Sequence, residues 1–140
     1  MNQLPTDLLM KRLVKLQMLL LIVACLLSGC GKSAEDEARA AIEALGGKYF
    51  TDSRGYINTL FLSNTQITDA GLEHLKELTR LHTLWLANTQ ITDAGLEHLE
   101  GLTSLEVLTL DNTQISDAGL EHLKGLTKLR VVALGGTQIT

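Results

Sequence analysis

The stretch NTQITDAGLEHL, from Asn64 to Leu75, decides the fold because the chain carries it three times. It returns unchanged at residues 88–99, and again at residues 112–123 with a serine in place of the second threonine. A sequence that repeats at a fixed period of this length is typical of repeat architectures, in which each copy is one supersecondary unit. The period is 24 residues, and it is marked by the first residue of the Thr-Gln-Ile triplet, at Thr65, Thr89, Thr113 and Thr137.

Each period has a strand half and a helix half. Leu84 and Leu86 alternate with exposed positions, which predicts a short strand, and Leu96 and Leu99 lie three apart, which predicts a short helix. We expect the hydroxyl residues that precede these helices to be their N-caps, and the aspartates that follow to favour the helix dipole. The expected caps are Thr68, Thr92 and Ser116, and the aspartates are Asp69, Asp93 and Asp117. One unit alone buries too little apolar surface to fold, so each copy is expected to form the wall of the next.

This pattern resembles the leucine-rich repeat family, in the form LxxLxLxxTxITDxGLxxLxxL that is common in bacterial surface proteins. The resemblance covers residues 57–140, as three full repeats and one incomplete repeat. It implies an α/β leucine-rich repeat solenoid, a right-handed horseshoe segment with a parallel sheet on the concave face and helices on the convex face. The corner residue that is usually Asn in the family is Thr here. We expect these threonines, Thr65, Thr89, Thr113 and Thr137, to form a hydroxyl ladder that bonds the backbone of neighbouring repeats.

The N-terminus has the pattern of a secretory signal peptide, predicted over residues 1–29. Lys11, Arg12 and Lys15 precede an apolar run from Leu16 to Leu27, which is too short to span a bilayer comfortably. The nine residues before Met10 do not fit a signal peptide, so we expect Met10 to be the true start. An ordinary secretion signal and a retained membrane anchor are the alternatives.

The end of this segment, LSGC at residues 27–30, resembles the lipobox of bacterial lipoproteins. The resemblance implies that Cys30 is acylated, for example with palmitate, and that it becomes the first residue of a membrane-anchored protein in the cell envelope. Gly31 favours the outer membrane in a Gram-negative cell, since lipoproteins held in the inner membrane carry Asp there. The protein would then face the periplasm or the cell surface. Residues 30–33 would be the lipidated cysteine and a short linker.

Residues 34–56 are predicted to form an N-terminal cap. A helix is expected after Ser33, ending at Gly46 and Gly47, and a strand and a turn lead into the first repeat. At the other end the sequence stops after Thr140, where the next helix is expected to begin. We expect either self-association through this uncapped end or a fragment of a longer repeat protein.

Residues between the strand leucines are predicted to point outward from the concave face and to bind an unknown protein or glycan. Phe61 and Trp85 should touch across adjacent strands and resemble an interface hot spot. The alternative is that this pair only covers the cap or pads a weak sheet. The other predicted binding residues are Thr109, Thr59, Thr83, Asp111, His82, Glu106 and Arg130.

Composition and motifs exclude several other functions. The formal net charge of −4, without a basic patch, disfavours nucleic-acid binding. No nucleophile elbow, phosphate loop or zinc motif is present, so we expect no enzyme activity and no cofactor. His74, His98 and His122 recur with the repeat, each beside a glutamate, and we interpret them as a solvated helix face rather than a metal site. The sequence thus predicts a lipid-anchored, non-catalytic interaction module, with homotypic assembly or a structural role in the cell envelope as the alternative.

Overall fold

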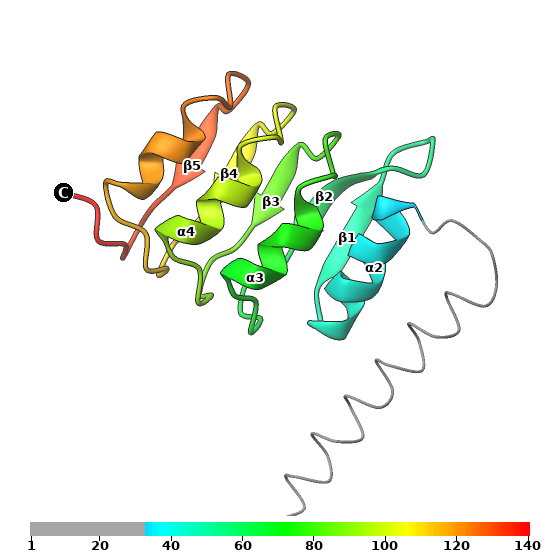
Figure 1. The fold of residues 1–140 in the computed structure, drawn as a ribbon, viewed down its shortest axis with the longest axis horizontal. Coiled ribbons are helices and arrows are strands. Elements are labelled where there is room, and N and C mark those ends of the chain that lie inside the picture. Colours follow the sequence, from blue (N-terminus) through cyan, green and yellow to red (C-terminus); the bar gives the residue numbers. More distant parts are fainter. Residues whose placement is uncertain (1–32) are drawn as a thin grey trace, which may run out of the picture. The chain divides into compact units, whose positions relative to one another are not determined.

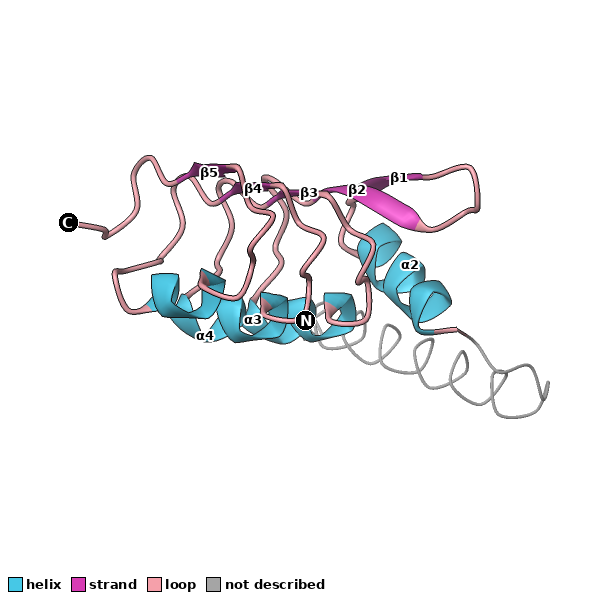
Figure 2. Cartoon of the chain, turned by 90° about the horizontal axis from the view of Figure 1, so that it is seen from above, coloured by secondary structure: helices cyan, strands magenta, loops and turns pink. Residues whose placement is uncertain are grey.

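The computed structural model describes residues 33–140, so the predicted leader and Cys30 lie outside the described residues. Five strands form one sheet in the order β1-β2-β3-β4-β5, and the helices occupy a second layer on one side of it (Figures 1 and 2). In residues 33–140, no helix combines the length and the apolar character that a membrane crossing needs.

The elements follow one another as the repeat predicts. Strands β2 to β5 are parallel, and each pairs with the next at a shift of one repeat, so that Leu60 lies beside Leu84 and Leu84 beside Leu108. Strand β1 is antiparallel to β2. This arrangement confirms the predicted α/β solenoid. The elements are α2 (Ala34–Ala44), β1 (Lys48–Thr51), β2 (Ile57–Phe61), α3 (Asp69–Leu72), η1 (Glu73–Leu75), β3 (Thr83–Trp85), α4 (Asp93–Leu96), η2 (Glu97–Leu99), β4 (Val107–Thr109), η3 (Gly119–Leu123) and β5 (Val131–Ala133).

The core is a stack of leucine and isoleucine side chains between the two layers. Leu84, Leu86, Ile91, Leu96 and Leu99 of the second repeat are all fully buried. The corresponding residues of the neighbouring repeats belong to the same cluster, so each repeat covers the apolar face of the next.

The helix half of each repeat is shorter and tighter than an ordinary α-helix. In the first two repeats one α-helical segment of four residues continues into a 3₁₀ segment, and in the third only a 3₁₀ segment is formed. The spacing of the buried leucines explains this, because Leu96, Leu99 and Leu102 lie three apart and a 3₁₀ helix has three residues per turn.

Two of the three hydroxyls expected to cap these helices do not do so. Thr68 and Thr92 occupy the N-cap positions with extended backbones, but neither side chain makes a capping hydrogen bond. Thr92 instead donates both its N–H and its hydroxyl to the carboxylate of Asp69, at 2.8 and 2.6 Å. The predicted side-chain cap is therefore wrong for these two residues, and at Thr92 the reason is that a carboxylate from the preceding repeat is the stronger acceptor.

The same two-pronged contact, which we call the aspartate clasp, joins every later pair of repeats. Ser116 donates its N–H and hydroxyl to Asp93 at 2.8 and 2.6 Å, and Thr140 donates likewise to Asp117 at 3.2 and 2.7 Å. Ser116 also accepts a 3.3 Å bond from the N–H of Ala118, so here alone the predicted cap persists in part. The clasp links residues 23 apart in sequence, and it therefore fixes the spacing of adjacent repeats.

The glycine that follows each clasp makes room for it. A Cβ atom on Gly95 would lie 2.3 Å from Asp69 Oδ1, and one on Gly119 would lie 2.3 Å from Asp93 Oδ1. Neither glycine has a positive φ angle. The glycines of the second and third Asp-Ala-Gly motifs are thus required by the close approach of the preceding repeat, whereas a Cβ atom on Gly71, in the first motif, would lie 2.8 Å from the side chain of Ile67 in its own repeat.

The expected threonine ladder between repeats is also wrong. The hydroxyls of Thr65, Thr89, Thr113 and Thr137 each donate to the carbonyl oxygen three residues earlier in the same repeat, at 2.6–2.7 Å. The ladder between repeats is built one residue earlier, by the amides of asparagines: Asn88 donates to Asn64 at 3.1 Å, and Asn112 donates to Asn88 at 2.9 Å. These asparagines have φ angles of 54–62°, a conformation that Asn tolerates better than most residues, and it aligns the amides while the threonines close the corner.

The N-terminal segment contains the predicted helix and hairpin. Ser33 and Asp36 form a capping box at the start of α2, and Gly46, with a φ angle of 74°, follows its end. Ala38 and Ile42 are buried against the repeats, and β1 extends the sheet by one antiparallel strand.

Candidate functional site

The outer surface of the sheet, which we call the sheet face, is made of alternate residues from each strand. Leu60, Leu84 and Leu108 point inward and are fully buried, so their neighbours on either side point outward. Side chains in register across the strands form columns. One column is Thr59, Thr83, Val107 and Val131, and another is Phe61, Trp85, Thr109 and Ala133.

Three aromatic rings form a continuous row at one end of the sheet face. Phe61 and Trp85 stack with ring centroids 5.7 Å apart and planes at 26°, as adjacent in-register positions allow. Phe50 meets Phe61 edge to face, with centroids 5.9 Å apart at 85°. Phe50 is 64% exposed and Trp85 is 40% exposed, so the row presents an apolar surface to solvent.

Phe50 was not among the predicted binding residues. It reaches the sheet face because β1 pairs antiparallel with β2, which places Phe50 opposite Thr59 and Lys48 opposite Phe61. Residues directly opposite one another in such a pair share a face. The alternation of Lys48 and Phe50 with Tyr49 is a sequence signal for this face, but the register needed to assign it comes only from the structure.

The side chains at the opposite end of the sheet face are smaller, and one of the predicted binding residues there is not exposed. Thr109 was expected to point to solvent, yet it is buried, with 7% exposure, and its hydroxyl has no hydrogen-bond partner in the described residues. The large Trp85 lies directly beside it on β3. Beyond it lie Ala133, which is half-buried, and Val131, which is 51% exposed.

The predicted polar residues line the margins of the sheet face. His82 and Arg130 are exposed and Glu106 is half-buried, and their backbones continue the ladder just before the strands. Asp111 uses one carboxylate oxygen to accept the N–H of Gly135 at 2.8 Å, so it has a structural role between repeats. The predicted residues therefore share one face, and their role in binding stays a prediction.

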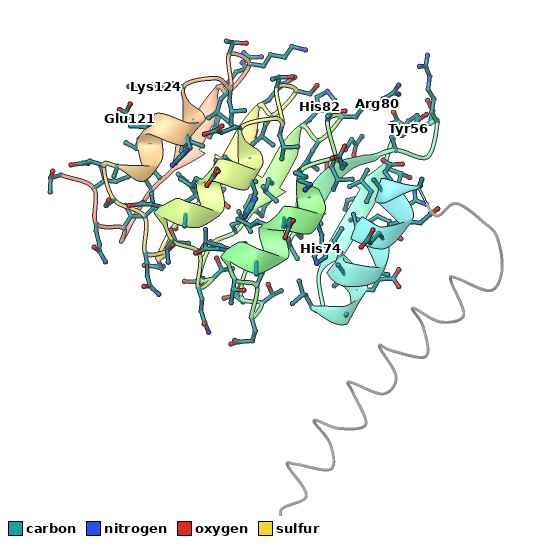
Figure 3. All side chains as sticks on the ribbon, in the orientation of Figure 1. Tyr56, His74, Arg80, His82, Glu121 and Lys124 are labelled. Carbon is teal, nitrogen blue, oxygen red and sulfur yellow. The ribbon has the colours of Figure 1, made fainter. Side chains whose placement is uncertain are left out.

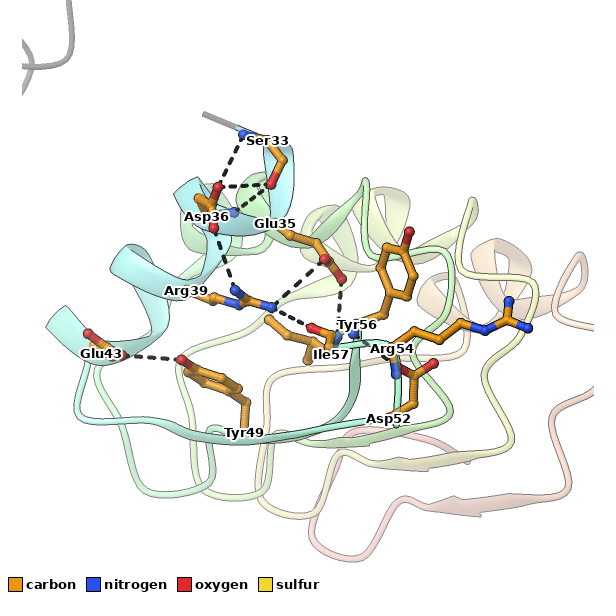
Figure 4. A network of polar contacts seen from close by, with 11 residues as sticks. Ser33, Glu35, Asp36, Arg39, Glu43, Tyr49, Asp52, Arg54, Tyr56 and Ile57 are labelled. Atoms are coloured by element: carbon orange, nitrogen blue, oxygen red, sulfur yellow. Dashed lines mark hydrogen bonds and ion pairs between the residues drawn. The ribbon is translucent and has the colours of Figure 1, made fainter. Parts of the chain in front are cut away.

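A polar network holds the β1–β2 hairpin, and with it Phe50, in place (Figure 4). Arg39 on α2 donates to the carbonyl oxygen of Gly55, and Glu35 accepts the N–H of Ile57 at 3.1 Å. Asp52 Oδ1 accepts the N–H groups of Arg54 and Tyr56 at 2.8 and 3.0 Å. These bonds, that from Tyr56 first, hold the pKa of Asp52 below its usual value.

A cation–π contact closes the same hairpin from the first repeat. The guanidinium of Arg80 lies 3.9 Å from the centroid of the Tyr56 ring, and both residues lie near His82 at the hairpin end of the sheet (Figure 3). The hairpin is thus fixed from α2 on one side and from the repeats on the other.

The recurring histidines do not converge on a metal site. His122 Nδ1 lies 2.6 Å from Glu100 Oε1, which makes an ion pair between repeats when the imidazole is protonated. Among residues 33–140, no group of three or more His, Cys, Asp and Glu side chains could hold a metal ion. A polar hollow of about 250 Å³ lies near His74, lined by Ala34, Glu37, Glu73, His74, Lys76 and Glu77.

Comparison with known proteins identifies the repeats. The family model for leucine-rich repeats in two copies matches residues 57–101 and again residues 79–122. No protein of curated function is significantly similar to the chain.

Two solved structures of internalins from Listeria monocytogenes are similar in part. One is 28% identical, covers 59% of this chain and 30% of the internalin, and has a TM-score of 0.41. The other is 23% identical, covers 74% of this chain and 65% of the internalin, and has a TM-score of 0.35. The chain therefore spans less than two thirds of the length of either internalin. Residues 57–122 are leucine-rich repeats, and the described part of the chain is an α/β leucine-rich repeat solenoid.

Proposed function

We propose that this protein is a non-catalytic interaction module that binds another protein through the sheet face. The observation that carries the proposal is the exposed row of Phe50, Phe61 and Trp85 on a rigid sheet. Aromatic side chains dominate the binding energy of protein interfaces, and rings already packed together lose little freedom on binding.

The ring geometry favours a protein ligand over a glycan. Phe61 and Trp85 are stacked on one another at 5.7 Å, so each ring covers a face of the other. A sugar ring is recognised by stacking on an open aromatic face, whereas apolar side chains of a protein also pack against exposed ring edges. A polypeptide can therefore bind the aromatic row without separating the stacked rings.

The proposal includes attachment to a bacterial cell envelope through a lipid on Cys30. Its support is the basic and apolar leader that ends in LSGC, at residues 27–30. Two or more acyl chains give a stable anchor.

The binding proposal is tested by affinity capture from envelope extracts with the full chain. We expect the wild type to retain a protein that Trp85→Ser loses, because the serine removes most of the aromatic surface. The control is His74→Ser, which changes an exposed residue of η1 on the opposite layer. Equal retention by all three proteins, or retention of this chain alone, would contradict the proposal, and the second result would point to homotypic assembly.

The anchor is tested separately by expressing the wild type and Cys30→Ser in a bacterium that processes lipoproteins. The wild type should fractionate with membranes and carry a mass increase at its N-terminus. The variant should lose the mass increase and leave the membrane fraction. A wild-type chain without acyl mass would contradict lipid attachment, whatever the result of the capture experiment.

A further inference from the structure

We propose that the cap strand β1 is part of the binding surface, and that the ligand is an acidic polypeptide segment that places an apolar side chain on Phe50. This inference rests on the proposed function and specifies its partner. The cap of a solenoid closes the end of the core. Here it also carries the most exposed large apolar side chain of the described residues, at 64% exposure.

Phe50 remains 64% exposed although its ring contacts Phe61. It touches Phe61 edge to face, and through Phe61 it is continuous with Trp85. Its strand is held by antiparallel pairing with β2, and the bonds from Arg39 to Gly55 and from Ile57 to Glu35 fix the turn and the start of β2. A ligand that buries Phe50 therefore meets a surface that is already ordered.

The charges around Phe50 specify the second property of the ligand. Lys48 precedes Phe50 by two residues and Arg54 follows it by four in the hairpin, and Arg80 lies over Tyr56 at the turn. The only carboxylate of residues 48–61 is Asp52, which accepts two backbone N–H groups and also lies within the electrostatic reach of Arg80 and Arg54, so one carboxylate faces three cations. Within the described residues, none of these three cations has a carboxylate partner in an ion pair. In a chain with a net charge of −4, this is a cationic surround, and it is complementary to an acidic ligand.

A polypeptide fits this surface better than an anionic membrane. Glu106 directly precedes β4 and Asp111 follows it by two residues, so both carboxylates lie at the margins of the sheet face. A flat bilayer of anionic lipid would meet these carboxylates together with the cations, whereas a narrow peptide that follows β1 contacts the cations only.

The experiment is selection of a random linear peptide library on the immobilised full chain, followed by affinity measurement of the enriched peptides. We expect peptides that combine an aromatic or branched aliphatic residue with Asp or Glu, and binding that weakens as salt is raised. Phe50→Ser should weaken the binding at least about tenfold, and so should the double variant Lys48→Glu with Arg54→Glu.

Two matched variants serve as controls. Val131→Ser removes an apolar side chain that is 51% exposed at the far end of the same face. Lys128→Glu reverses an exposed cation outside the hairpin. Both should bind the peptides within about twofold of the wild type.

The outcomes separate this inference from the proposed function. Peptides that are lost with Trp85→Ser, but not with Phe50→Ser or the charge variant, would overturn the inference and leave the proposed function standing. Failure to enrich any peptide would count against both. Sedimentation of the wild type with anionic vesicles, lost with Phe50→Ser, would overturn the inference in favour of a membrane surface.

Discussion

Two regions of the molecule differ in what their side chains contact. One is the set of loops that carry the repeated stretch from Asn to Gly, and the other is the sheet face. In the loops, the corner threonines bond their own repeat, and the other recurring contacts join neighbouring repeats: the asparagine amides form a ladder, and the aspartates accept from the next Thr or Ser. On the sheet face the in-register residues differ from strand to strand, as Phe61, Trp85, Thr109 and Ala133 show.

The difference separates stability from recognition. A contact between repeats works only if both repeats supply it, so the residues that make it recur with the period. A position on the sheet face is free of that requirement, and it can vary without weakening the stack. Substitutions in the loops should therefore affect unfolding more than substitutions on the face.

The largest effect is expected where the clasp leaves no space. Gly95→Ala places a Cβ atom 2.3 Å from Asp69 Oδ1, and we expect the free energy of unfolding to fall by about 3 kcal/mol, at the upper end of overpacking costs. The measurement is urea unfolding followed by circular dichroism. Gly125→Ala is the control, since nothing lies within 4 Å of its Cβ position, and it should stay within about 0.5 kcal/mol of the wild type. Equal free energies of unfolding for the two variants would contradict the steric role of Gly95.

A smaller loss is expected at the buried corner of the loop. Thr89→Val removes the 2.7 Å bond to the carbonyl oxygen of Leu86, and it should cost about 1–2 kcal/mol by leaving a buried acceptor without that partner. Thr65→Val, at a half-buried position, should cost less because water can replace the hydroxyl. A larger loss at Thr65 would argue against this account when both variants are compared by thermal unfolding.

The clasp should also make stability depend on pH. The hydroxyl of Thr140, followed by its N–H, holds the pKa of Asp117 below its usual value, so the folded state binds this proton less readily than the unfolded state. The stabilisation is complete above the unfolded pKa of about 3.9, and it is lost as pH falls through the lower folded pKa. Asp117→Asn should therefore be less stable than the wild type at neutral pH, and the gap should narrow in acid. A difference in stability between Asp117→Asn and the wild type that is the same at neutral and acidic pH would contradict the lowered pKa of Asp117.

The smallest effect on stability is expected on the sheet face. Phe50→Ser should cost no more than about 1 kcal/mol, since the side chain is 64% exposed and loses chiefly its edge contact with Phe61. Its thermal unfolding should lie close to that of the wild type, although binding is lost. A loss as large as that of Gly95→Ala would mean that the aromatic row holds the cap rather than a ligand.

The fold was predictable from the leucines, whereas the details of the polar contacts were not. Leu84, Leu86 and Leu96 specify strand, corner and helix by spacing alone, because burial follows periodicity. The hydrogen-bond partner of a threonine hydroxyl depends on backbone angles that cannot be read from the sequence. Asn88 has a positive φ angle, and its amide donates to Asn64 of the preceding repeat, whereas the hydroxyl of Thr89 donates to Leu86 of its own repeat.

The candidate site was predictable in its centre and not at its edges. The contact of Phe61 with Trp85 follows from the repeat register, and it is confirmed. The burial of Thr109 depends on how the large side chain of Trp85 packs beside it. The position of Phe50 on the sheet face depends on the antiparallel register of β1, which lies outside the repeats. Both are tertiary facts that periodicity does not encode.

The most direct test of the central claim is photo-crosslinking in living cells from two positions of the full chain. A photoreactive amino acid replaces Trp85 on the sheet face or His74 on η1, and the adducts are identified by mass spectrometry. The account predicts an adduct with a different protein from position 85 that is absent from position 74. The same adducts from both positions, or no adduct from position 85, would contradict the claim that the sheet face is the recognition surface.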